Sequence, residues 1–197
     1  SEGGFTSISK NATTGAITTQ SSISSAGVSS FDANTMAVEA GTGITGGTGT
    51  IYRSSVQRVG GIITTRILID LTGLRSTASG DIIGVNGTSN VCHIGQITAA
   101  RNGTILTGSM ECFEAPAGGD PDINVHSATE GTGVEDGAIS DLTETLLVNA
   151  GDATLGSKVY FTAVPAADEF LYLTLGDTTD ADYTAGKLFI ELMGYEA

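Results

Sequence analysis

Short runs in which hydrophobic and polar residues alternate fill most of the chain after its N-terminal segment, and turn-forming residues separate them. In the run 62–71, Ile67 and Ile69 fall on one face and Arg66 and Asp70 on the other, which is the pattern of a half-buried strand. Eight further runs predict strands: 81–85, 91–100, 104–115, 123–129, 143–149, 158–164, 170–175 and 187–195. Such spacing predicts an all-β fold, either an antiparallel β-sandwich or a jelly-roll-like domain.

Helical spacing of apolar residues is not sustained anywhere, so at most one helical turn is expected, near 141–145. The dipeptide Asn102-Gly103 predicts a two-residue hairpin loop between the strands on either side of it. In that register, Cys112 pairs with His93, which is the residue after Cys92 in the sequence. Because side chains alternate between the two faces of a strand, the two sulfurs would lie on opposite faces, which predicts reduced cysteines.

The N-terminal segment has a different composition from the rest of the chain. Residues 1–50 are rich in Ser, Thr, Gly and Ala and carry almost no charge, so they can hardly close a core of their own. The glycine-rich run 41–50 is typical of a flexible hinge. We therefore expect an extended N-terminal arm with its hinge over residues 1–55 and a β-sandwich domain over residues 56–197.

The charge of the chain limits its partners. Its 22 acidic and 8 basic residues give a formal net charge of −14, which repels nucleic-acid phosphates and anionic bilayers. No run is long and apolar enough to span a membrane, and the N-terminus SEGGFTSISK lacks the build of a signal peptide. We therefore expect no direct nucleic-acid or membrane partner, and synthesis in a cytoplasm.

The residues that could bind a soft metal are few. They are Cys92, His93, Cys112 and His126, and zinc needs their donor atoms to converge on one point. Cys92 and His93 are adjacent on a predicted strand and point opposite ways, so at most His93 and Cys112 converge. We interpret this set as a core cysteine beside a partly buried histidine.

Other chemical motifs are absent or incomplete in the sequence. There is no G-x-S-x-G motif, and no Lys-Ser or Lys-Thr follows the glycines of 41–50 as a phosphate-binding loop requires. The long acidic segment 116–141 offers only Asp120 and Asp122 as a calcium-like cluster, and the paired Glu135 and Asp136 have no evident pocket. The sequence therefore predicts a binding protein rather than an enzyme, with no catalytic, cofactor-binding or metal-binding residues.

Three motifs carry a resemblance to a known group of proteins. They are INVHSATEGTGVEDGAI, AVPAADEFLYL and DYTAGKLFIELMGY. Together with the segments between them, they resemble capsid decoration (cement) proteins of marine tailed phages, including cyanophages. The similarity covers roughly residues 60–195.

The resemblance implies a structural virion protein on the outside of a phage head. Its partner would be the major capsid protein, whose subunit contacts it would stabilise, and it would form a homo-oligomer, a trimer or a dimer. The N-terminal arm would reach across neighbouring subunits, which fits a segment that adds strands to foreign sheet edges.

Two alternatives to a cement protein remain open. A head-fibre or tail adhesion protein that contacts the host surface predicts exposed aromatic platforms, whereas the chain has no Trp and five Tyr. A hydrolase predicts a cleft with a central histidine, for which only His93 and His126 are available.

Overall fold

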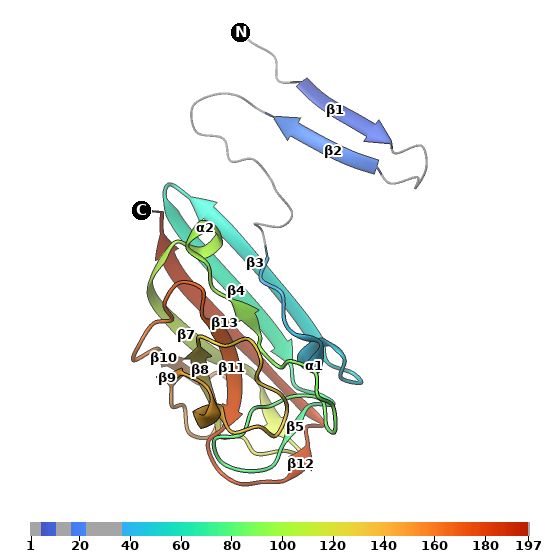
Figure 1. Ribbon diagram of the computed structural model, residues 1–197, viewed down its shortest axis with the longest axis vertical. Coiled ribbons are helices and arrows are strands. Elements are labelled where there is room, and N and C mark those ends of the chain that lie inside the picture. The colour runs from blue at the N-terminus through green and yellow to red at the C-terminus, as the bar shows by residue number, and fades with distance from the viewer. Residues whose placement is uncertain (1–4, 11–16, 23–36, 197) are drawn as a thin grey trace. The chain divides into compact units, whose positions relative to one another are not determined.

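The computed structural model describes residues 5–10, 17–22 and 37–196. The chain divides into two units, Ser1–Met36 and Ala37–Ala197. In the first unit, β1 (Phe5–Lys10) and β2 (Ile17–Ser22) pair antiparallel, with Phe5 opposite Ser22. The second unit contains the two larger sheets, most of whose strands are labelled in Figure 1, and the hydrophobic core.

The larger sheet of the second unit has five antiparallel strands. Their order across the sheet is β10 (Lys158–Tyr160), β7 (Thr104–Ala117), β13 (Ala185–Tyr195), β4 (Ile62–Asp70) and β3 (Ile51–Val59). β13 comes last in the chain but lies in the middle of the sheet, paired to β4 on one side and β7 on the other. This strand therefore joins the β3–β4 hairpin to the β7–β10 pair.

The smaller sheet has four antiparallel strands, in the order β6 (Gly95–Gln96), β11 (Phe170–Leu175), β8 (Ile123–Ala128) and β9 (Glu144–Val148). A short pair, β5 (Arg75–Ser76) and β12 (Ala181–Asp182), lies apart from both sheets. The helical elements of residues 37–196 are single turns: α1 (Thr42–Thr45), α2 (Ala99–Asn102) and the 3₁₀ turn η2 (Ile139–Asp141).

The core lies between the two sheets and confirms the predicted all-β sandwich. Ile67 and Ile69 of β4, Leu188 and Ile190 of β13 and Leu173 of β11 belong to one buried cluster. The predicted alternation holds along β4 and β13, where buried residues alternate with more exposed ones. Most predicted strands are confirmed to within a few residues, and the run 158–164 shortens to β10.

The hairpin predicted at Asn102-Gly103 is wrong. The run 91–100 contains only the two-residue β6, and Asn102 ends helix α2 with Gly103 at a φ of +69°. The Asn102 side chain is buried; it accepts from the Thr98 amide at 2.9 Å and donates to Thr65 Oγ1 at 2.7 Å. These two bonds hold the turn as a helix, so β7 pairs with β13 and β10 instead.

The run 81–85 does not form a strand either. Its backbone amides donate to three separate segments: Ile82 to Gly137, Ile83 to Leu173 and Gly84 to Arg75. Because no single neighbour takes all of these bonds, no ladder forms. The helical turn expected near 141–145 lies slightly earlier, at η2.

The predicted hinge at 41–50 is also corrected. This run contains α1, and Ile44 is completely buried in the core. A Cβ on Gly43 would lie 2.3 Å from the Cys92 Sγ atom, so the absence of a side chain there permits close packing rather than flexibility. The compact unit begins at Ala37 and not near residue 56, because Val38, α1 and β3 all belong to it.

Candidate functional site

The two cysteines are both buried and free, and they lie in different surroundings. Cys112 lies on β7 opposite Leu188 of β13 and belongs to the hydrophobic core. The Cys92 thiol donates to the Asn90 carbonyl oxygen. Burial raises the pKa of Cys92 to about 12, so its thiol is neutral and unreactive. The predicted approach of His93 to Cys112 is wrong, because β7 does not pair with the segment that holds His93.

His126 lies on β8, with its Nδ1 atom 2.7 Å from Glu144 Oε2 on β9. Among the residues that the structure describes, no three histidine, cysteine or carboxylate side chains come together to hold a metal ion.

His93 lines a shallow hollow of about 210 Å³ together with Glu39, Gln96, Arg101 and Phe170. The His93 and Phe170 ring centroids are 5.0 Å apart. Burial lowers the pKa of His93, so its imidazole is neutral at pH 7. The lining contributed by residues 37–196 includes no serine, threonine or cysteine, so it gives His93 no nucleophile to activate.

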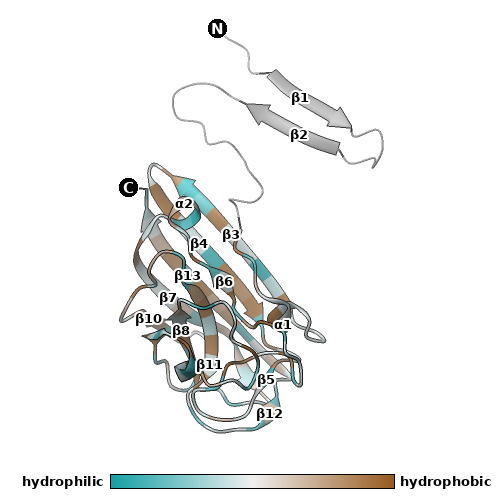
Figure 2. Ribbon diagram, viewed as in Figure 1, coloured by the Kyte–Doolittle hydropathy of each residue, from teal (hydrophilic) through white to brown (hydrophobic). Residues whose placement is uncertain are grey.

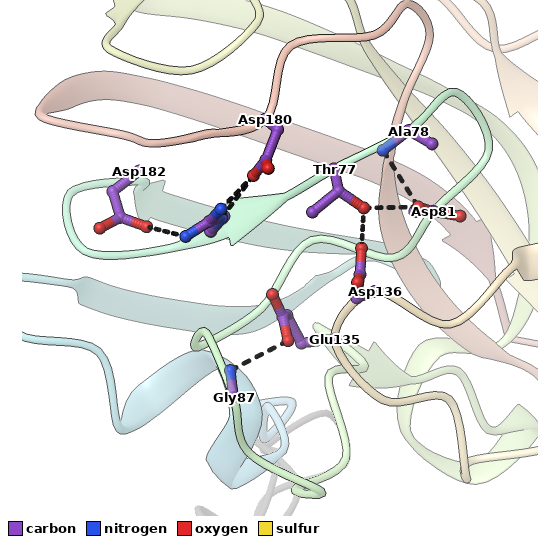
Figure 3. Close-up of polar contacts among 9 residues, drawn as sticks. Thr77, Ala78, Asp81, Gly87, Glu135, Asp136, Asp180 and Asp182 are labelled. Atoms are coloured by element: carbon purple, nitrogen blue, oxygen red, sulfur yellow. Dashed lines mark hydrogen bonds and ion pairs between the residues drawn. The ribbon is translucent and has the colours of Figure 1, made fainter.

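A second polar cluster surrounds the short β5–β12 pair (Figure 3). Arg75 of β5 forms ion pairs with Asp180 and, at 3.8 Å, with Asp182. Glu135 accepts the Gly87 amide hydrogen bond at 3.2 Å, and burial raises the pKa of this carboxyl. These contacts join the loops at one end of the sandwich.

Within this cluster, Asp81 and Asp136 both accept from the Thr77 hydroxyl (Figure 3). A hydroxyl has a single hydrogen, so it satisfies only one of two carboxylates at a time. Burial, with a smaller contribution from the charge of Asp136, raises the pKa of Asp81. We interpret the cluster as a connection between loops.

The acidic segment 116–141 does not form one site. Glu135 and Asp136 belong to the cluster near β5, whereas both carboxylate oxygens of Asp120 are already hydrogen-bonded. Asp120 Oδ1 accepts from the Asp122 amide at 2.9 Å and Oδ2 from the Thr179 hydroxyl at 2.7 Å. The Asp120 carboxylate therefore closes a local turn with Oδ1 and connects that turn to the distant Thr179 with Oδ2.

The outer surface of the five-stranded sheet is the largest feature that the sequence did not identify, and we call it the open face. It consists of the outward side chains Ile51, Arg53, Ser55, Gln57 and Val59 of β3; Ile62, Thr64, Arg66, Leu68 and Asp70 of β4; Thr107, Ser109, Glu111, Phe113 and Glu114 of β7; Lys158 and Tyr160 of β10; and Lys187, Phe189, Glu191, Met193 and Tyr195 of β13. Figure 2 shows hydrophobic and hydrophilic positions interspersed along β3 and β4.

Large apolar side chains gather on the open face. Ile51, Val59, Ile62, Phe113, Tyr160, Met193 and Tyr195 are 39 to 67% exposed. The rings of Phe113 and Phe189 stack with centroids 5.1 Å apart and an interplanar angle of 8°. A hollow of about 270 Å³ lies beside Phe189 and is lined also by Arg53, Arg66, Leu68 and two serines. Apolar groups exposed together on one face are typical of interaction sites.

The open face is electrically neutral, unlike the rest of the chain. Its four cations, Arg53, Arg66, Lys158 and Lys187, match its four carboxylates, Asp70, Glu111, Glu114 and Glu191. Most of these form ion pairs: Arg66 with Glu191 at 2.8 Å, Lys158 with Glu111 at 3.5 Å, and Lys187 with Asp70 at 3.4 Å and with Glu114. Of the 22 acidic and 8 basic residues in the chain, 18 acidic and 4 basic ones lie elsewhere.

The smaller sheet has no comparable face. All six residues of β8 are buried, as are five of the six in β11. On the outer side, the Tyr172 hydroxyl donates to the Glu130 carbonyl oxygen at 2.7 Å and accepts from the Gly133 amide at 3.3 Å. Those bonds hold a loop over this sheet, so one side of the sandwich is covered and the other is open.

No protein-family model, no curated protein and no solved structure matches this chain. None of the helices in the described residues is long and apolar enough to cross a membrane.

Proposed function

We propose that this chain is a structural virion protein, a capsid decoration (cement) protein that binds the outside of a phage head and stabilises contacts between major capsid subunits. The observation that carries the proposal is the neutral, aromatic open face on a protein with a net charge of −14. The motifs that resemble phage decoration proteins supply the class of partner in this proposal.

The open face is suited to bind another protein. Its apolar groups lose contact with water on binding, which favours association. An aromatic side chain contributes most to the binding free energy where it is already held in its bound position. Phe113 and Phe189 are held by their stacking, and Lys187 is held between Asp70 and Glu114. Little side-chain freedom is then lost on association.

The charge distribution favours one orientation on a capsid. A partner meets no net repulsion at the open face, whereas the acidic remainder of the chain would face solvent. A negative outer surface keeps particles apart and soluble. Many copies around a shell then combine weak individual contacts into a stable coat.

The test compares phage heads without this protein with heads to which the wild type, Tyr160→Glu or Leu155→Glu is added. Tyr160 and Leu155 are both highly exposed, but only Tyr160 lies on the open face. We expect the wild type and Leu155→Glu to raise the temperature at which heads release DNA. Tyr160→Glu should bind heads about tenfold more weakly, which corresponds to about 1.4 kcal/mol. Equal heat and osmotic resistance with and without the protein would contradict the proposal.

One observation favours the adhesion alternative. Tyr160 is 67% exposed and Lys158 Nζ lies 5.9 Å from its ring centroid, and an exposed ring beside a polar group is a feature of sugar-binding surfaces. Binding of the isolated protein to host cells distinguishes the two functions. An adhesion protein binds cells without the head, and a cement protein does not.

A further inference from the structure

Strand β3 forms one edge of the five-stranded sheet and has an unusually regular shape. It spans nine residues, contains no proline and pairs with β4 without a register shift from Ile51 to Val59. The other edge strand, β10, has three residues. Natural sheets protect their edges with short strands, prolines, bulges or charged side chains. β3 has none of the first three, and its charged side chains are Arg53 and Arg58.

The hairpin turn shows which backbone groups of β3 are free. Gly60 and Gly61, at φ +59° and +84°, connect Val59 to Ile62 as a two-residue turn, so Val59 and Ile62 form a hydrogen-bonded pair. Pairing alternates along an antiparallel ladder, so the odd-numbered residues of β3 bond to β4. The amides and carbonyls of Tyr52, Ser54, Val56 and Arg58 therefore point away from the sheet.

Within residues 37–196, these groups make no backbone hydrogen bond to another segment. One carbonyl has a side-chain partner, because Arg53 Nη1 donates to the Tyr52 oxygen at 2.8 Å. β3 also carries no acidic residue, although the chain as a whole is strongly acidic. It is a neutral-to-basic edge that can accept another strand.

We propose that β3 pairs antiparallel with β3 of a second copy of this chain, around a two-fold axis that passes beside Ser55. In this register Tyr52 lies opposite Arg58 of the second copy and Ser54 opposite Val56. The residues with free backbone groups then face one another, and about eight N–H···O bonds form. Among registers that join free groups to free groups, this one overlaps the whole strand.

The side chains of β3 are self-complementary in this register. Ile51, 44% exposed, lies opposite Val59 of the second copy, 65% exposed, and Val59 is already beside Ile62 on β4. An apolar cluster therefore closes at each end of the strand pair. Arg53 lies opposite Gln57, so no like charges face each other across the interface.

The dimer would join two sandwiches through one continuous sheet. Because both copies of β3 present the same side outward, the two open faces become one surface of twice the area. The pairing does not depend on the proposed function, since it rests on the edge and its register alone. It specifies a dimer, rather than a trimer, as the basic oligomer.

The first test measures the mass of the full chain by sedimentation equilibrium at micromolar concentration. We expect a dimer whose affinity increases with salt, because salt screens the repulsion between two chains of charge −14. A full-length chain that stays a monomer overturns the proposal and leaves the edge to another segment or partner.

Matched variants test the register. Ser55→Glu places two carboxylates opposite each other at the two-fold axis and should weaken the dimer at least about tenfold. Gln57→Glu adds the same charge on the same strand but faces Arg53, so it should not weaken the dimer. Equal effects of the two variants contradict the register, with far-ultraviolet circular dichroism confirming that both are folded.

A cross-linking experiment gives an independent readout. Facing residues in a non-hydrogen-bonded pair have Cα atoms about 4.5 Å apart, within the range of about 4.4 to 6.8 Å that a disulfide spans. Ser55→Cys should therefore form a covalent dimer under mild oxidation, while Gln57→Cys should not. The natural cysteines do not interfere, because both are buried. Failure of Ser55→Cys to cross-link overturns the proposed axis.

Discussion

At the scale of single residues, Asp81 and Asp136 stand out because two carboxyl groups share one hydroxyl. Burial raises the pKa of Asp81 above its ordinary 3.8. The folded protein therefore keeps a proton on Asp81 at pH values where the unfolded chain has lost it. The resulting stability is present below pH 3.8 and is lost as the pH rises through the raised pKa.

Asp136→Asn tests this arrangement. Asp136 has a φ of +62°, which asparagine adopts readily, and the substitution removes the negative charge beside Asp81. We expect the Tm at pH 7 to rise by about 2 °C, with a smaller gain at pH 3.5, where the raised pKa of Asp81 keeps that carboxyl largely protonated and uncharged. Thermal unfolding at the two pH values measures the effect, and a lower Tm at pH 7 would show that the pair is not repulsive.

At the scale of elements, helix α2 depends on the buried side chain of Asn102. Asn102→Ala removes its hydrogen bonds with Thr98 and Thr65 and should lower the free energy of unfolding by about 2 kcal/mol. Asn86 is a matched control, because it also precedes a glycine at positive φ but is exposed. Urea denaturation should show little change for Asn86→Ala. Equal effects would mean that Asn102 acts only as a turn residue.

The strands and turns also show which parts of the fold can be predicted from sequence patterns. Alternation predicts β4 and β13 well, because each has neighbours along its full length and its buried residues alternate with more exposed ones. Asn102-Gly103 misleads, because the same dipeptide that suits a hairpin turn also suits a helix end followed by a glycine at φ +69°. The distinction depends on Thr65, which is distant in sequence.

Glycine content misleads for a similar reason. Gly43 and Gly84 would each place a Cβ 2.3 Å from the Cys92 Sγ atom, so these glycines permit close packing. In the sequence, however, Gly43 belongs to a run that resembles a flexible linker. The open face is equally inaccessible to sequence reasoning. Its ion pairs form because β13 lies between β4 and β7, and local patterns do not specify that order.

At the scale of the whole molecule, the position of the unit boundary makes a prediction about truncation. A chain that starts at Ala37 retains the entire core cluster, so deleting residues 1–36 should leave the Tm of the sandwich within a few degrees of the wild type. Deleting residues 1–50 also removes the buried Val38 and Ile44 and should cost several kcal/mol. Differential scanning calorimetry measures both, and equal stability of the two truncations would place the boundary nearer residue 56.

The whole molecule also has an asymmetry that underlies the proposed function. One sheet is covered by loops, whereas the other presents neutral, partly aromatic side chains to solvent. The same chain carries a large negative charge elsewhere. A protein built in this way has one side suited to contact a partner and another suited to remain in water.

The most direct test of whether the open face binds a phage head is a cryo-electron microscopy map of the phage particle at a resolution that distinguishes the two sheets. We expect density for the sandwich on the outside of the head, with β3, β4 and β13 in contact with the major capsid protein and the loops around Arg75 exposed to solvent. A particle without this density on its head, or with the open face turned to solvent, would contradict this expectation.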